Sequence, residues 1–266
     1  MLNYFKPKNQ NKYKPMKTTT KTFIASLLLG SVPAFAQFDA DSNLLPDGKV
    51  FAAPDSGSLY ISGKAGLMGG SFKPSAFSDF KLDTLGSAAF AVGYQPNANF
   101  RFEVEIAGAS GDLKEGSDGM NEIEYLYDLI LLEGAGAFTM DIKGETSIFS
   151  VTAQAYYLTE IAPNFNLMLN AGVGMMKADL EFSYDIYIAT RYSGGTLYGN
   201  YYSSESTEYS ANFLYASVGG GLEWMISNNL SLSLTGRYVL SQEKDMDGLK
   251  AKPDLYAIYT GLTFTF

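Results

Sequence analysis

The sequence contains no cysteine and no histidine. Without cysteine the chain has no disulfide, no thiolate ligand for zinc and no cysteine nucleophile. Without histidine it lacks the commonest metal ligand, the usual general base near neutral pH and every catalytic pairing of histidine with serine or cysteine. Most hydrolytic and metal-dependent active sites are therefore excluded, and we expect no cofactor and no metal ion.

Basic residues are scarce relative to acidic ones. The 266 residues include 19 Lys and Arg against 28 Asp and Glu, a formal net charge of -9. This balance argues against a nucleic-acid backbone as a partner. Six of the lysines lie in residues 1–36, which hold no acidic residue, so the rest of the chain has 13 basic and 28 acidic residues, a balance of -15.

Residues 1–36 are predicted to be a secretory signal peptide. A basic lead-in is followed by the short apolar stretch Thr22–Ala36, which ends in an Ala-Phe-Ala sequence. A basic region, an apolar core and small residues at the cleavage site are typical of export signals, and the run is too short for a membrane helix. The long lead-in leaves the start open between Met1 and Met16. We expect residues 37–57 to form a polar, poorly ordered periplasmic lead-in.

The remaining chain has no apolar run of about 20 residues, and its apolar and polar residues alternate instead. In Phe100–Ile106 the apolar side chains take one face, and Arg101, Glu103 and Glu105 take the other. This period of two predicts β-strands with two different faces. Eight segments follow the pattern, at 58–68, 85–95, 100–106, 147–158, 165–175, 213–226, 230–238 and 255–266.

Such strands fit a soluble sandwich or a membrane barrel, and three features favour the barrel. The polar faces consist mainly of Ser, Thr, Gly and Asn, which suit a narrow lumen. Aromatic residues beside the short turns resemble an interfacial girdle. These residues are Tyr94, Phe100, Tyr157, Phe165 and Trp224. Short turns at 96–99, 160–164 and 227–229 alternate with long external loops at about 69–84, 110–146, 177–212 and 241–254.

The sequence therefore predicts an all-β fold, an antiparallel up-and-down β-barrel that spans a membrane over residues 58–266. A closed barrel is the arrangement of strands alone that satisfies every backbone group in lipid. We predict eight strands. The alternatives concern Tyr125–Leu132 and Gly136–Ile142, which would form an extra hairpin above the membrane, a ten-stranded barrel or a short rim helix.

The last strand alternates to the end of the chain. One face carries Tyr256, Ile258, Leu262, Phe264 and Phe266. Together with several earlier pieces, this strand resembles the small bacterial outer-membrane β-barrel superfamily, which includes the OmpA transmembrane domain, opacity-type surface proteins and rickettsial surface antigens. The pieces are Leu59–Gly66, Ala91–Pro96, Phe100–Glu105, Asn170–Gly174, Gly219–Gly221 and Thr235–Tyr238.

This resemblance implies a location and partners. The location is the outer membrane of a Gram-negative bacterium, in contact with its lipids and lipopolysaccharide. The C-terminal strand would be recognised by the barrel-assembly machinery during biogenesis.

Strand parity places six charged side chains inside the barrel. They are Lys64, Arg101, Glu103, Glu105, Glu223 and Arg237. Both signs in a narrow lumen predict an ion-pair network, because an unpaired buried charge is strongly destabilising. Such a network would be either a rigid plug or a gate whose pairs rearrange to open a small channel.

Two of the predicted loops carry unusual compositions. The segment 110–146 is acidic, but Asp112, Glu115 and Asp118 lack the spacing of a calcium loop, so we expect a solvated acidic loop. The segment 177–212 is rich in tyrosine, and mixtures of Tyr, Ser, Gly and Asn make adaptable binding surfaces. We consider both a surface-recognition loop and a flexible loop with strand extensions. The tyrosines of the recognition hypothesis are Tyr192, Tyr198, Tyr201 and Tyr202.

Three functions are weighed. The first is a non-enzymatic surface barrel with a structural, adhesive or antigenic role and a host or environmental ligand. The second is a narrow gated porin or small-solute channel. The third is an enzyme, but outer-membrane lipid-modifying barrels and protease barrels depend on histidine, which this chain lacks.

Overall fold

The computed structural model describes residues 57–74, 79–114, 137–191, 197–246 and 249–266. The predicted signal peptide and nearly all of the predicted lead-in lie outside these residues. No helix in the described part of the chain is long and apolar enough to cross a membrane.

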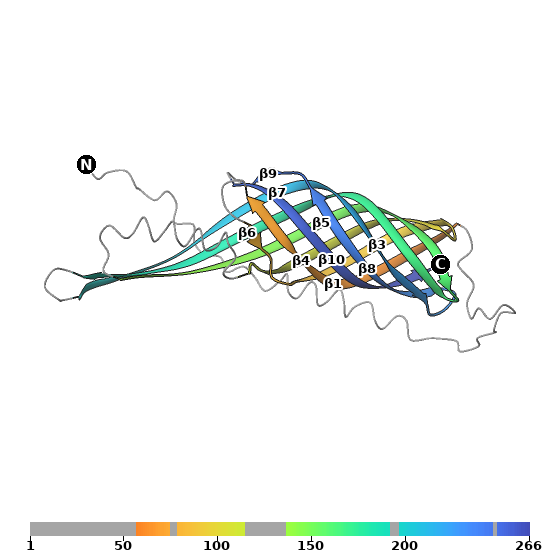
Figure 1. Cartoon of the computed structure of the whole chain (residues 1–266), viewed down its shortest axis with the longest axis horizontal. Coiled ribbons are helices and arrows are strands. Elements are labelled where there is room, and N and C mark those ends of the chain that lie inside the picture. The colour runs from red at the N-terminus through yellow and green to blue at the C-terminus, as the bar shows by residue number, and fades with distance from the viewer. Residues whose placement is uncertain (1–56, 75–78, 115–136, 192–196, 247–248) are drawn as a thin grey trace. The chain divides into compact units, whose positions relative to one another are not determined.

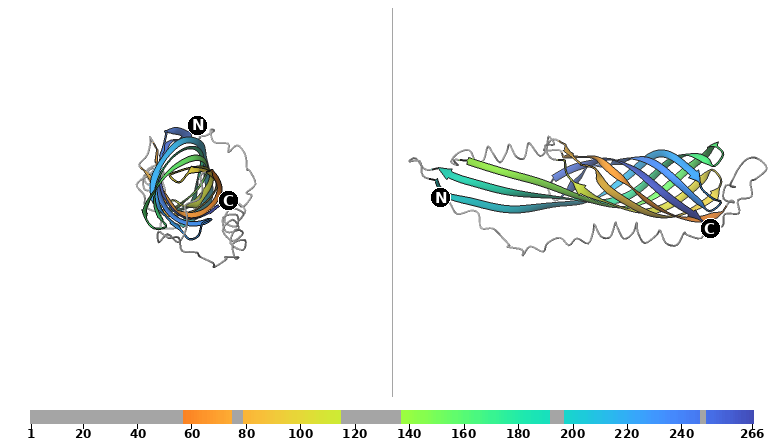
Figure 2. Two further views of the ribbon diagram at one scale, coloured as in Figure 1. Left: turned by 90° about the vertical axis from the view of Figure 1, so that its right-hand side faces the viewer. Right: turned by 90° about the horizontal axis from the view of Figure 1, so that it is seen from below.

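Eight long antiparallel strands form a closed ring (Figures 1 and 2). They are β1 (Ser58–Pro74), β3 (Leu85–Asn97), β4 (Phe100–Asp112), β5 (Ala137–Ala162), β6 (Phe165–Arg191), β7 (Leu197–Met225), β8 (Leu230–Ser241) and β10 (Leu249–Thr265). Two short strands, β2 (Phe80–Lys81) and β9 (Lys244–Met246), pair with β1 and β10 outside the ring order. The prediction of eight barrel strands is confirmed, and the ten-stranded alternative is wrong.

The ring closes between its first and last strands. β10 pairs antiparallel with β1 from Tyr60↔Thr265 to Pro74↔Ala251. No edge of the sheet is therefore left open within the barrel. Closure matters because lipid cannot satisfy unpaired backbone groups.

The strands are staggered around the ring. If paired residues are followed around the ring from Tyr60 of β1, the path returns to β1 at Gly70, ten residues further along the strand. The residues on this path are Gly93, Glu103, Gln154, Gly172, Ser217, Val239 and Leu255. In barrels, strand number and stagger fix the tilt of the strands and the width of the interior. Eight strands leave an interior that side chains just fill.

Large apolar side chains cover the outside of the barrel. On β4 and β10 the exposed positions include Val104, Ile106, Ile258 and Leu262. The aromatic residues predicted for the girdle point outward beside the short turns, and Phe165 stacks on Trp224 with ring centroids 6.1 Å apart. We call this apolar outer band the belt. An apolar belt with aromatic residues at its ends is typical of a barrel in a lipid bilayer.

The polarity of both faces reverses towards the end opposite the short turns, which we call the outer end. On β6, Val173 and Met175 face outward, whereas Lys177, two residues further on, presents a charge on the same face. Inside, the buried polar Asn170 gives way to buried Met176 and Leu180. The strand therefore leaves the apolar belt near Met175 and continues in water around an apolar interior.

Parts of two predicted external loops, 110–146 and 177–212, prove to be strand. Residues 137–146 belong to β5, residues 177–191 to β6 and residues 197–212 to β7. The predicted hairpin partner Gly136–Ile142 is also corrected, because Ala137–Ile142 extends β5 and pairs with β6. Tyr125–Leu132 lies outside the described residues. Sequence reasoning stopped these strands where the outward face ceases to be apolar, but backbone pairing continues beyond that level.

β5, β6 and β7 run on past their ring neighbours (Figure 1). β4 pairs with β5 only as far as Asp112↔Glu145, and β8 pairs with β7 only as far as Tyr215↔Ser241. We call residues 137–144, 182–191 and 197–207 the arm. At about 3.3 Å per residue, the β6 part of the arm is about 30 Å long.

The belt makes a direct prediction about stability. Val104 faces outward near the middle of the apolar belt, so Val104→Arg should lower the free energy of unfolding by about 2–4 kcal/mol. Urea unfolding in lipid vesicles, followed by the fluorescence of the single tryptophan, Trp224, measures this change.

Ser206→Arg is the matched control, since Ser206 is exposed on β7 beyond the belt. We expect it to change the free energy by less than about 0.5 kcal/mol. Equal losses for the two variants would contradict the assigned belt.

Candidate functional site: the barrel lumen

The lumen near the short turns holds a buried ion pair. Arg101 of β4 donates to Glu223 of β7 and to the side-chain oxygen of Gln95 at 2.7 Å. Glu223, which is fully buried, also accepts from Ser231 at 2.7 Å and from Asn166 at 3.1 Å. Both charges are thus paired and further hydrogen-bonded, which a buried ion pair requires to be stable.

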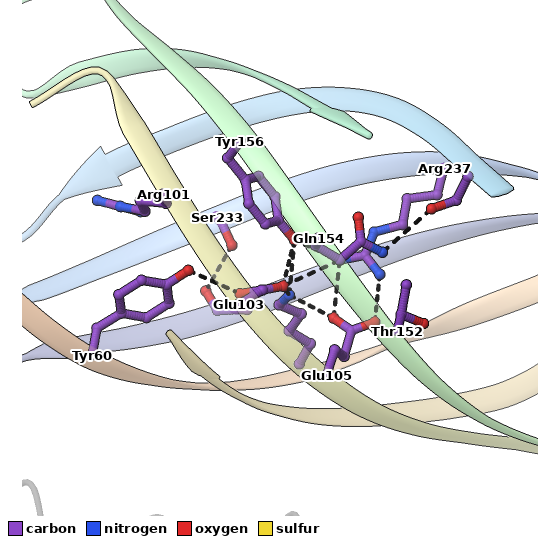
Figure 3. A network of polar contacts seen from close by, with 12 residues as sticks. Tyr60, Arg101, Glu103, Glu105, Thr152, Gln154, Tyr156, Ser233 and Arg237 are labelled. Atoms are coloured by element: carbon purple, nitrogen blue, oxygen red, sulfur yellow. Dashed lines mark hydrogen bonds and ion pairs between the residues drawn. The ribbon is translucent and has the colours of Figure 1, made fainter. Parts of the chain in front are cut away.

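A second cluster lies further along the lumen (Figure 3). Lys64 of β1 donates to Glu103 and, at 2.6 Å, to Glu105, both of β4. Arg237 of β8 binds Glu105 through both terminal nitrogens. Four side chains from three strands therefore bridge the interior, and bidentate contact fixes the guanidinium plane.

Tyrosines complete both clusters, and sequence reasoning missed them. Tyr156 donates to Glu103 at 2.6 Å and accepts from Arg237 at 2.7 Å, and Tyr60 donates to Glu103 at 3.3 Å. The Arg101 guanidinium lies 5.6 Å from the Tyr60 ring, so this tyrosine joins the two clusters. Strand parity could have indicated that Tyr156 faces the lumen, because its neighbour Tyr157 faces outward.

The network is electrically balanced. Lys64, Arg101 and Arg237 face Glu103, Glu105 and Glu223, three positive charges against three negative ones. A cavity of about 20 Å³, lined by both clusters, remains between them. Such a volume holds about one water molecule.

Towards the outer end the lumen is filled by apolar side chains. This apolar core corrects the expectation of a small, polar lumen along the whole barrel. Its largest fully buried members are Phe72, Phe80, Phe213, Leu85, Leu180, Met246 and Leu255. The short strands β2 and β9 supply Phe80 and Met246, so the chain folds back over the mouth and closes it. This core therefore fills the outer part of the lumen with packed side chains.

The structure brings together all six predicted lumen residues. They are Lys64, Arg101, Glu103, Glu105, Glu223 and Arg237. Among the residues with described coordinates, no group of three or more acidic side chains is placed to hold a metal ion. Asp112 ends β4 and is exposed, whereas Glu115 and Asp118 lie outside the described residues.

The predicted tyrosine loop is corrected to strand. Tyr198, Tyr201 and Tyr202 belong to β7, while Tyr192 lies outside the described residues. Of the predicted C-terminal face, Tyr256, Ile258 and Leu262 are exposed on the belt. Phe264 packs edge-on against Phe266 at 5.2 Å.

The buried pair makes a stability prediction. Arg101→Ala should lower the free energy of unfolding by about 3–5 kcal/mol, because it leaves Glu223 buried without its cation. The shift of the folded band on a gel after heating reports the loss. The double variant Arg101→Met with Glu223→Leu should lose much less, since neither charge remains. Unchanged melting of Arg101→Ala would overturn the structural role.

The apolar core makes a second prediction. Phe213→Ala should lower the free energy of unfolding by about 3–5 kcal/mol, because a fully buried ring leaves a cavity. Its neighbour Leu214 is 60% exposed on the belt, and Leu214→Ala should lose less than about half as much. The same urea titration measures both, and a larger loss at Leu214 would contradict the core.

No protein-family model matches the chain, and no curated protein sequence matches it. Three solved structures show its general similarity to other barrels. Neisserial surface protein A is 15% identical, with a TM-score of 0.46, covering 78% of this chain and 97% of that one. Ail, the attachment invasion locus protein of Yersinia pestis, is 17% identical with a TM-score of 0.39, covering 79% and 99%. The outer membrane protease OMPT from Escherichia coli is 12% identical with a TM-score of 0.43, covering 79% and 97%.

These likenesses are too distant to indicate a function. The fold follows from the chain's own strand pairing, its closed ring and its outward apolar belt. The protein is a closed, eight-stranded antiparallel β-barrel with an apolar outer belt.

Proposed function

We propose that the protein is a non-conducting, non-enzymatic surface barrel of the outer membrane that holds its arm outside the bilayer as a recognition element. The observation that carries this proposal is the doubly filled lumen. One level is filled by three cations and three carboxylates, and the next by buried apolar side chains. A barrel with this interior supports a structural, adhesive or antigenic role better than transport.

The arm is the part of the barrel best placed to meet a partner. Its strands continue outward from the level of Lys177, where the outer surface turns from apolar to charged. Phe182 packs against Phe80 at 5.2 Å and against Tyr209 at 6.0 Å, so the base of the arm is anchored on the apolar core. A binding segment held on a packed base loses less entropy on binding than a free loop.

Conductance separates this proposal from the alternative of a narrow gated porin or small-solute channel. Residues 37–266, refolded and inserted into a planar bilayer, should give no reproducible current steps. Folding is checked beforehand by the heat-dependent gel shift. Conductance steps altered by Arg101→Ala or Glu103→Gln would establish a gated pore and overturn the proposal.

Removal of the arm tests the recognition role. Ser183 and Ser206 are direct cross-strand partners, so deletion of residues 184–205 with an Asn-Gly turn inserted there should preserve the register. Bacteria displaying this variant should lose at least about tenfold in attachment to host-cell monolayers or abiotic surfaces, whichever the intact protein promotes. The folded gel band and surface labelling must be unchanged. Undiminished attachment would contradict a role for the arm.

A further inference from the structure

β7 presents an unpaired edge along the arm and its base. Above Tyr215↔Ser241, no strand in the described part of the chain pairs with β7 on the side away from β6. β9 approaches β7 without pairing with it. The edge therefore exposes a row of backbone N–H and C=O groups. Such a row is a ready template for another strand.

The protection of this edge consists of two glutamates, Glu205 and Glu208. Proteins commonly shield exposed edges with charged side chains, especially lysine, or with proline or a β-bulge. Residues 203–209 contain neither proline nor lysine, and their pairing with β6 shows no register shift. Four of these seven residues are serine or threonine, whose small side chains allow another backbone to approach. The segment is about 23 Å long, enough for a strand of typical length.

Two glutamates give the edge a negative charge. Glu205 and Glu208 lie on opposite faces of the sheet, since side chains alternate along a strand. Glu205 accepts a hydrogen bond from Tyr184 at 2.9 Å, and Glu208 lies directly across from Glu181, a like charge. No lysine or arginine among the described residues forms an ion pair with either glutamate. A partner carrying positive charge would relieve this repulsion.

We propose that the β7 edge at residues 203–209 binds an extended, lysine- or arginine-rich segment of a partner protein by strand addition. The proposal rests on the recognition role of the arm and names the chemistry of its partner. Backbone hydrogen bonds to the edge supply affinity, and Glu205 and Glu208 select basic side chains on the two faces of the added strand. A second copy of β7 is disfavoured, because pairing two such edges would gather four carboxylates in one short sheet.

The β7 edge is also a better choice than the β5 edge of the arm. The β5 part of the arm carries Lys143, whose positive charge does not favour a basic segment.

The test uses the refolded barrel, residues 37–266, and a fluorescent peptide of about ten residues that alternates threonine and valine and carries two lysines three positions apart. Two further peptides carry N-methyl groups on alternate backbone nitrogens, one at odd and one at even positions. We expect the parent peptide to bind, as measured by fluorescence anisotropy. Only one N-methylated isomer should bind, because an added strand pairs along one of its two edges.

Matched protein variants locate the contact. Glu205→Lys with Glu208→Lys should weaken binding of the parent peptide by about tenfold, from the loss of two charge contacts. Glu145→Lys with Glu160→Lys on β5 makes the same change in charge away from the β7 edge and should weaken it by less than about threefold. Because the chain has no cysteine, Ser206→Cys also allows a disulfide to a cysteine-bearing peptide, which fixes the register.

Several results would overturn the proposal. They are no binding of the parent peptide, equal binding of the two N-methylated isomers, or equal weakening by the two pairs of glutamate substitutions. The recognition role is judged separately by deletion of residues 184–205, which removes Glu205 and shortens the β7 edge to residues 206–209. If that deletion abolishes attachment while the two N-methylated isomers bind equally, the arm recognises its partner by a face and not by the β7 edge.

Discussion

The pairing of β10 with β1 is the contact on which the remainder of the structure depends. An open eight-stranded sheet would expose two rows of unpaired backbone groups to lipid, each group with a penalty of several kcal/mol. Closure removes both rows and, with the stagger of the strands, sets the width of the interior. That width brings Lys64 of β1 and Arg237 of β8 within hydrogen-bonding distance of Glu105 on β4.

Each strand then passes through two environments. Within the belt, lipid surrounds the barrel, so the outside is apolar and the inside holds the polar groups. Beyond Met175 water surrounds it, and the hydrophobic effect places Leu180 and Phe182 inside and Lys177 outside. The barrel is thus a membrane protein over one part of its length and has the packed core of a soluble β-protein over the next. This second core anchors the strands of the arm where no lipid can support them.

The two fillings of the lumen differ in their physical character. The ion-pair network is held by directional contacts and is sensitive to the loss of one partner, since a single remaining charge would be buried alone. The apolar core is held by close packing and is sensitive to lost volume. Together they fill the described interior of the barrel. The β7 edge is notable because its backbone groups lack the pairing that the closed ring provides elsewhere.

By itself the sequence determined the class of fold, the eight barrel strands and the residues that face the lumen, because alternation with period two is a local property. The six charged lumen residues were identifiable because each shares the parity of its strand's polar face, as Glu103 and Glu105 do between Phe102, Val104 and Ile106. Parity also assigned the outward aromatic residues beside the short turns, such as Phe165 and Trp224.

Only the tertiary structure decided which lumen residues meet, since the stagger of the ring sets their relative levels. It joined Arg101 to Glu223, 122 positions apart in the chain, and brought Tyr60 and Tyr156 to Glu103. It also decided where the strands end. Beyond the belt the apolar face turns inward, so residues 177–191 and 197–212, which the pattern predicted to be loop, continue as paired strand. Local sequence records the change of polarity, but pairing with a distant strand determines whether the backbone stays extended.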